Sequence, residues 1–173
     1  MSPFREKASS AMASRQAGDA VRHKVLVQAP AARAFSVFTE GLGRWWPREY
    51  SWSRRVLDSA FIEPQAGGRC VERSTYGNEF DWGRIQVWEP PRRLVLSWMI
   101  GPDRIPEPDP DRASEVEVQF VAEGPTATTV EIEHRGFARH GAEADRHRAG
   151  MEQGWPLILE RFAAAVTPAG PGV

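Results

Sequence analysis

Few side chains in this sequence could do acid–base chemistry from a protected position, and His134 is the sharpest candidate. In the segment TTVEIEHR at 128–135, Val130 and Ile132 alternate with polar residues. Strict alternation therefore places His134 on the same apolar face of a strand. An imidazole there could act as an acid or a base near neutral pH. The alternative, which we favour, is a structural histidine whose ring is satisfied by a backbone partner near the sheet edge.

Glu72 is the second candidate, in the predicted strand RCVERSTY at 69–76. If Cys70 faces inward, alternation sends Glu72 inward as well. A carboxylate inside an apolar sheet is costly unless it meets a cation or has a raised pKa. The opposite phase, with Val71 inside and Glu72 in solvent, agrees equally well with the sequence.

Seven tryptophans are unusual for 173 residues. Large aromatic side chains either fill a core or line a ligand pocket, and core is the safer interpretation for any single one. The hypothesis of an internal pocket assigns ligand contact to several of these aromatic residues, oriented by one or two polar groups. The candidate ligand-binding residues are Trp46, Glu72, Trp82, Trp88, Trp98, Phe120, His134 and Trp155.

The sequence offers no recognisable metal or cofactor motif. Cys70 is the single cysteine, which excludes an intramolecular disulfide and a zinc site built from cysteines. His140 and His147 lie near Glu143 and Asp145 without a metal-binding spacing, so a solvated helix face is the expected structure. No phosphate-binding loop, dinucleotide fingerprint or nucleophile elbow is present. We therefore expect no cofactor and no metal.

Alternation of apolar and polar residues predicts the strands that must position these side chains. A strand at 21–28 is followed by an amphipathic helix that begins after Ala29-Pro30, and by a short helix or turn at 44–47. The other predicted strands occupy 56–63, 69–76, 80–89, 93–99, 114–122 and 128–135, with a loop at 101–112. Because no helices separate these later strands, an α+β fold with a curved antiparallel sheet of about six to seven strands is expected.

The C-terminal third reads as helical, and the sheet should wrap around it. Gly154 and Pro156 predict a break, with a short helix from about Ala142 and a longer one from Pro156. The apolar residues of this region recur at helical spacing and predict one buried stripe, formed by Trp155, Ile158, Leu159, Phe162 and Val166.

Length and charge limit the class of protein. The 22 Lys and Arg residues nearly balance the 23 Asp and Glu residues, which gives no sign of a nucleic-acid or membrane-surface footprint. No apolar run approaches the roughly 18 residues of a membrane span, and the first twenty residues lack the apolar core of a secretory signal. We expect a cytoplasmic protein with a single domain at 21–166 between flexible tails at 1–20 and 167–173.

Several strings resemble the START-like helix-grip superfamily, and within it the bacterial domains similar to the activator of heat-shock-protein-90 ATPase. They are FSVFTEGLGRWWP at 35–47, GGR at 67–69, WGRIQVWEPPRRLVLSW at 82–98 and GW at 154–155. The resemblance spans about 21–166. It implies a concave sheet that grips the long helix around an apolar cavity. Relatives bind lipids, sterols, polyketides or plant hormones, and a few are cyclases or hydrolases.

Three functions follow as expectations. The first is a binding module for a hydrophobic or aromatic small molecule. The second is an enzyme resembling polyketide cyclases, with His134 as base or Glu72 as acid. The third is a chaperone-binding module, which would need an exposed apolar patch around Trp45 and Trp52. Monomer and homodimer both agree with the sequence.

Overall fold

The structure is a computed structural model that describes residues 19–167, so the predicted tails at 1–20 and 167–173 lie almost entirely outside the described residues. The elements follow the predicted order of one strand, two short helices, six strands and a long helix. The strands are β1 (Val21–Val27), β2 (Leu57–Ile62), β3 (Arg69–Ser74), β4 (Glu79–Glu89), β5 (Arg93–Trp98), β6 (Ser114–Ala122) and β7 (Thr128–Arg135). The helices are α2 (Ala31–Thr39), α3 (Leu42–Trp45) and α4 (Ala144–Val166), with short 3-10 turns η1 (Arg48–Tyr50), η2 (Arg54–Val56), η3 (Pro102–Arg104) and η4 (Phe137–Glu143).

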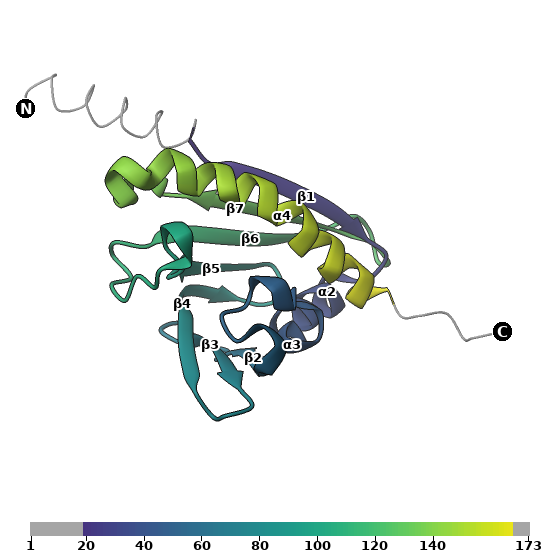
Figure 1. Cartoon of the computed structure of the whole chain (residues 1–173). Coiled ribbons are helices and arrows are strands. Elements are labelled where there is room, and N and C mark those ends of the chain that lie inside the picture. The colour runs from purple at the N-terminus through teal and green to yellow at the C-terminus, as the bar shows by residue number, and fades with distance from the viewer. Residues whose placement is uncertain (1–18, 168–173) are drawn as a thin grey trace, which may run out of the picture.

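The seven strands form one antiparallel sheet in the order β1-β7-β6-β5-β4-β3-β2. Figure 1 shows the long helix α4 lying along this curled sheet, with α2 and α3 near the C-terminal end of α4. The helix α4 contacts β1 as well as α2 and α3. This arrangement confirms the predicted helix-grip fold.

The alternation read from the sequence decides which side chains enter the core. In β6, Val116, Val118 and Phe120 are buried, whereas Glu115 and Gln119 lie on the opposite face. The neighbouring strand β7 follows the same rule. Its inward residues are Val130, Ile132 and His134, all of them buried. The first two are apolar, and His134 is the polar exception at the end of the strand.

The helix α4 runs without interruption from Ala144 to Val166, so the predicted break at Gly154 and Pro156 is wrong. Proline removes one backbone hydrogen bond, the one that would reach the carbonyl four residues earlier. That residue is Glu152, which is exposed, so water can satisfy its carbonyl oxygen. Burial of the apolar stripe then keeps both halves of the helix on the sheet; the stripe is the predicted Trp155, Ile158, Leu159, Phe162 and Val166.

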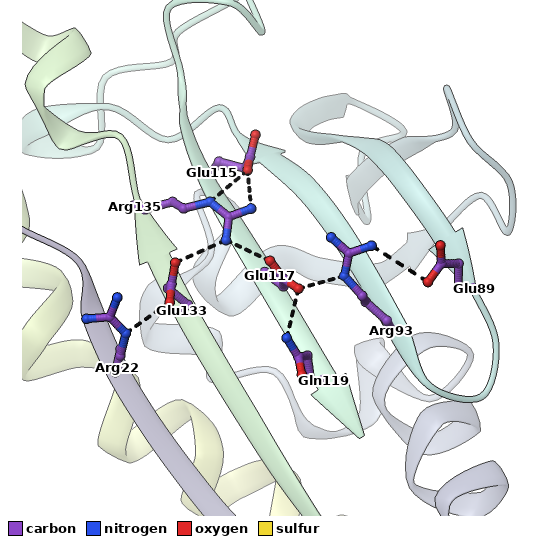
Figure 2. A network of polar contacts seen from close by, with 8 residues as sticks. All are labelled: Arg22, Glu89, Arg93, Glu115, Glu117, Gln119, Glu133 and Arg135. Atoms are coloured by element: carbon purple, nitrogen blue, oxygen red, sulfur yellow. Dashed lines mark hydrogen bonds and ion pairs between the residues drawn. The ribbon is translucent and has the colours of Figure 1, made fainter. Parts of the chain in front are cut away.

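The outer face of the sheet carries alternating charges that continue from β1 to β4 (Figure 2). Arg135 donates to Glu115 and Glu117, and Arg93 donates to Glu117 at 2.6 Å. Partial burial would raise the pKa of Glu117, but hydrogen bonds from Arg93, Arg135 and Gln119 lower it to about 2. This face is therefore polar and internally paired, and the apolar chemistry of the molecule lies on the inner side.

Candidate functional site

A cavity of about 580 Å³ lies on the inner side of the sheet, between α4, the segment that follows β5, and the chain between α3 and η1. Its helix wall comes from residues 146–158 of α4, and its loop wall comes from residues 100–104. Trp46, Tyr50 and Trp98 provide aromatic surface. This volume falls in the range of small-molecule sites.

Two glycines on α4 leave the helix wall open. Gly150 and Gly154 are four residues apart and so lie one above the other on one face of the helix. A Cβ atom added at Gly150 would meet nothing within 4 Å, and one added at Gly154 would meet only Cε2 of Tyr50 at 4.0 Å. The two glycines thus leave space unfilled at the cavity. This arrangement is unfavourable for the helix itself, because a glycine inside a helix lowers its stability by about 0.5–1 kcal/mol relative to alanine.

The aromatic wall is built by three tryptophans from separate elements. Trp46 stacks on Trp82 with ring centroids 5.7 Å apart and an interplanar angle of 18°. Trp98, at the end of β5, meets the ring of Trp82 edge-on at 5.7 Å and that of Trp46 at 6.0 Å. Trp46 is half-buried and offers apolar ring surface at the cavity, whereas Trp98 borders the cavity with a side chain that is only 3 % exposed.

The loop wall is held in an unusual backbone conformation. Asp103 and Arg104 are consecutive non-glycine residues with φ of 56° and 62°, in the left-handed region that L-residues rarely adopt. The Arg104 guanidinium holds the loop by donating to the carbonyl oxygens of Glu49 at 3.1 Å and Ser51 at 2.8 Å. Burial, with a contribution from nearby Arg54, lowers the pKa of Arg104.

An ion pair joins the loop wall to the helix wall. The guanidinium of Arg146 on α4 donates to both carboxylate oxygens of Asp103, at 2.6 and 2.7 Å, and also pairs with Glu143. Asp103 and Arg146 line the cavity and keep more than half of their side-chain surface in solvent. The pair therefore connects two cavity walls at the surface of the molecule.

His134 lies beneath this cavity and uses both ring nitrogens within the core. Trp155 Nε1 donates to His134 Nδ1 at 3.2 Å, and His134 Nε2 lies 2.8 Å from Ser114 Oγ. Because an indole can only donate, Nδ1 must accept, and the proton of the neutral ring is on Nε2 and is donated to Ser114. Burial, followed by the nearby His147 and His140, holds the pKa of His134 well below its ordinary value. The side chain contacts are those of a structural histidine.

His147 is buried and lines the cavity, so the expectation that it belongs to a solvated helix face is wrong. It packs edge-on against His140 with ring centroids 4.7 Å apart, and against Phe137 at 5.4 Å. Burial, with a smaller effect of His140, lowers the pKa of His147 to about 4. The ring is therefore neutral at pH 7, and its Nε2 has no hydrogen-bond partner among residues 19–167.

Glu72 points inward but does not line the cavity. It is 4 % exposed, and its carboxylate accepts hydrogen bonds from the backbone N–H of Trp52 at 3.1 Å, the backbone N–H of Ser53 at 2.7 Å and the Ser53 hydroxyl at 2.8 Å. These three donors compensate for the loss of water around a buried carboxylate. Through these bonds Glu72 fixes the segment between η1 and η2 to strand β3.

The other predicted ligand-binding residues divide into two groups. Trp82 backs Trp46, and Trp155 lies under Trp98 with ring centroids 5.5 Å apart, so both support the cavity wall from behind. Trp88 and Phe120 instead both pack edge-on against Phe35 from α2, each with ring centroids 5.1 Å apart. That contact belongs to the core under α2 and is separate from the cavity.

The exposed patch expected around Trp45 and Trp52 is not formed. Trp45 is buried, and its indole donates to the carbonyl oxygen of Val37 at 2.9 Å. Trp52 is half-buried, and its indole donates to the carbonyl oxygen of Arg104 at 2.9 Å. Both rings are committed to packing and to hydrogen bonds within the domain.

Sequence reasoning missed the loop and helix residues of the cavity, above all Arg104, Arg146, His147 and Met151. The segment 101–112 shows only the proline and charge content of a loop. One usable signal is the pair Gly150 and Gly154, because glycines four residues apart leave an open face on a helix. That signal requires the helix to continue through Pro156.

Within residues 19–167, no three His, Cys, Asp or Glu side chains are grouped so that they could hold a metal ion. In the same part of the chain, no helix combines the length and apolar character needed to span a membrane.

The chain matches known proteins over most of its length. The family described as Activator of Hsp90 ATPase homolog 1-like protein matches residues 28–167. No curated protein matches the sequence.

Two solved structures combine clear sequence identity with the same fold. The anthrahydroquino-gamma-pyrone synthase Txn09, complexed with SUM, is 38% identical, with a TM-score of 0.61, and the match covers 84% of this chain and 96% of that chain. The self-sacrificing resistance protein CalC from Micromonospora echinospora is 35% identical, with a TM-score of 0.60, and the match covers 85% and 93% of the two chains. CalU16 from the same organism, at 22% identity, a TM-score of 0.56 and coverage of 86% and 76%, shares the fold.

Proposed function

The chain belongs to the family of Activator of Hsp90 ATPase homolog 1-like proteins, and on that premise we propose that it binds a hydrophobic, planar aromatic small molecule in the cavity between α4 and the loop after β5. A fold does not define a function, so the proposal depends on the site. The bound molecule would lie against Trp46 and Trp98, with the glycine face of α4 opposite.

The observation that carries this proposal is the composition of the cavity walls. Ring surface from Trp46 and Trp98, with Met151 and Ile158 from α4, surrounds a space that Gly150 leaves unfilled. Pockets with mainly apolar walls and a few polar groups are typical of small-molecule sites. Burial of ligand surface here would contribute about 25 cal/mol per Å² before the costs of association.

The relatives support an aromatic ligand. The name of Txn09 describes it as the synthase of an anthrahydroquino-pyrone, which is a fused-ring compound. CalC is described as a resistance protein. A synthase must accommodate the small organic molecule that it converts, and we extend that need from Txn09 to this chain as part of the proposal.

A pair of variants on α4 tests the cavity directly. N-phenyl-1-naphthylamine is an uncharged aromatic probe whose emission rises in apolar sites. We expect the wild-type protein to bind it, and Gly150→Leu, which places a side chain in the open space, to weaken binding at least about tenfold. Ala149→Leu adds the same side chain to the preceding, exposed residue of the helix and should change binding by less than about twofold.

Gly150→Ala shows whether a side chain at this position harms folding. Alanine should stabilise the helix by about 0.5–1 kcal/mol, so weaker binding by Gly150→Leu can then be attributed to the filled space and not to unfolding. A wild-type protein that fails to bind the probe and carries no co-purifying compound in native mass spectrometry would overturn the proposed function. So would a Gly150→Leu protein that binds as well as wild type.

A second candidate function is catalysis in the same cavity, favoured by one observation. His147 lines the cavity, and its imidazole, with a pKa of about 4, is a weak base that would take up only a comparatively acidic proton from a bound substrate. Txn09, a relative with 38% identity, is described as a synthase. If the chain converts a compound that it binds, His147→Gln should lower kcat at least about a hundredfold with little change in KM. Turnover that survives this substitution would exclude His147 as the base.

A further inference from the structure

One cation in the cavity wall has no acidic partner. Three charged side chains line the cavity, and two of them, Asp103 and Arg146, pair with each other. The third is Arg104, whose guanidinium donates only to backbone carbonyl oxygens of residues 49–51. In the part of the chain that the structure describes, no carboxylate lies within ion-pair distance of this guanidinium.

The surroundings of Arg104 leave its positive charge uncompensated. Burial, followed by the nearby Arg54, lowers the pKa of Arg104, whereas Glu72 raises it. The carboxylate of Glu72 already accepts three hydrogen bonds, from Trp52 and Ser53. Arg54 itself forms no ion pair within residues 19–167. Because a half-buried cation has lost part of its hydration, this wall of the cavity favours a negative group.

Two hydrogen-bond donors in this wall are unused and open to the surface. The Nε–H of Arg104 and the hydroxyl of Tyr50 have no partner in the described chain, and neither atom is enclosed, unlike Nε1 of Trp98. Both residues are half-buried and line the cavity. The Tyr50 ring reaches the helix wall, where its Cε2 lies 4.0 Å from the position of a Cβ at Gly154. Arg104 donates to the carbonyl oxygen of Tyr50 and interacts with its phenol, so the two donors belong to one part of the wall.

From these contacts we infer that the bound aromatic molecule carries an anionic oxygen group, in its simplest form a carboxylate, which pairs with Arg104 and accepts a hydrogen bond from the Tyr50 hydroxyl. Arginine N–H and phenol O–H groups both donate to carboxylate oxygens, and hydrogen bonds between charged partners are the stronger ones. The inference rests on the proposed function and narrows it. The rings lie against Trp46 and the acidic group lies at the loop wall. Asp103 does not oppose this arrangement, because both of its oxygens accept from Arg146.

2-Naphthoate and 2-naphthamide are matched probes, because they share one ring frame and nearly one shape but differ in charge. Their affinities for the full-length chain are measured by calorimetry at neutral pH. We expect naphthoate to bind about five- to fiftyfold more tightly. Burial alone would give the opposite order, since leaving water costs a carboxylate more than an amide. Raising NaCl from about 50 to about 500 mM should weaken the binding of naphthoate and leave that of naphthamide nearly unchanged.

Three substitutions identify the groups that recognise the anion. Arg104→Gln removes the charge and should abolish the preference for naphthoate. Because the readout is a ratio of two affinities, a general weakening of the cavity does not imitate this result. Arg112→Gln makes the same change at an arginine that is 71 % exposed and outside the cavity, and should keep the preference. Tyr50→Phe removes only a hydroxyl and should reduce the preference about two- to fivefold.

A measurement on the wild-type protein covers the case in which Arg104→Gln fails to fold, since Arg104 also holds its loop. The Nε–H resonance of Arg104 is followed by NMR in the ¹⁵N-labelled chain. Naphthoate should shift this proton downfield, and naphthamide should shift it much less. A signal that responds equally to both probes would overturn the assigned contact.

The outcomes separate this inference from the function on which it rests. Equal affinities, or tighter binding of naphthamide, with N-phenyl-1-naphthylamine still bound, would overturn the anionic ligand and leave the cavity function in place. A preference for naphthoate that survives in Arg104→Gln would overturn the role of Arg104. A chain that binds none of the three probes would overturn both proposals.

Discussion

The indole N–H of Trp155 on α4 donates a hydrogen bond to Nδ1 of His134 on β7, 3.2 Å away, and so places the histidine proton on Nε2. This bond joins the long helix to the end of the sheet beneath the proposed ligand cavity. It also occupies the Nδ1 acceptor of His134, whose ring lies 5.5 Å from that of Trp98. This one contact therefore fixes the tautomer of His134 and links α4 to the end of β7.

His134→Ala should destabilise the domain by about 2–4 kcal/mol, because it opens a void and leaves the indole of Trp155 without an acceptor. Urea unfolding measures the change. A double-mutant cycle with Trp155→Phe should give a coupling energy of about 1 kcal/mol. A coupling energy near zero, or a His134→Ala protein as stable as wild type, would contradict the structural role.

Glu72→Gln should cost about 1–3 kcal/mol, since an amide supplies one oxygen where the carboxylate uses two to accept from Trp52 and Ser53. Hydrogen exchange at the Trp52 and Ser53 amides should become faster. Glu79→Gln on the adjacent strand breaks an exposed pair with Arg73 and should have a much smaller effect on stability, because solvent screens that pair. Equal effects of the two substitutions would show that Glu72 does not anchor this segment.

Stability should fall as the pH drops from about 6.5 towards 4, because the unfolded chain binds a proton at His147 that the folded chain does not accept until about pH 4. For His147 alone the loss is at most about 3 kcal/mol across this window. His134, whose pKa is also lowered by burial, adds to it in the same direction. Unfolding free energies at pH 7 and pH 4.5 measure the slope, and His147→Gln should make it shallower. An unchanged slope would mean that His147 does not resist protonation.

Asp103→Asn should loosen the cavity loop with little effect on global stability. The pair with Arg146 is more than half exposed, so solvent screening leaves it little contribution to folding. It is nevertheless a direct link between the loop and α4, and the amide of Gly101, bonded to Ile105, should exchange faster without it. Glu143→Gln removes the other partner of Arg146 without touching the loop and serves as the control. Identical exchange in both variants would argue against this role.

The order of elements and the two faces of most strands could be predicted from the sequence. Alternation is local and has a period of two, so Val116, Val118 and Phe120 identify the inner face of β6 without knowledge of its neighbours. The same rule correctly placed His134 inside. The stripe on α4 follows in the same way from the helical period.

The phase of Glu72 shows where local reasoning stops. Within β3, Cys70, Glu72 and Ser74 are buried at alternate positions, and Val71 between them is buried as well. Because both faces of the strand are covered at this point, the sequence alone cannot tell which phase faces the core. Which of them meets a hydrogen-bond donor depends on the segment between η1 and η2, about twenty residues earlier in the chain.

The sequence by itself determined the fold, the inward position of His134 and the apolar face of α4, because each depends on a short repeating pattern. Tertiary structure alone decided that α4 continues through Pro156, that His147 is buried and that the Trp98 N–H is enclosed without a hydrogen-bond partner among residues 19–167. These features depend on which side chains from distant segments occupy the same space. The space at Gly150 likewise depends on tertiary structure. It exists because α4, the loop after β5 and the chain between α3 and η1 meet there and none of them fills it with a side chain.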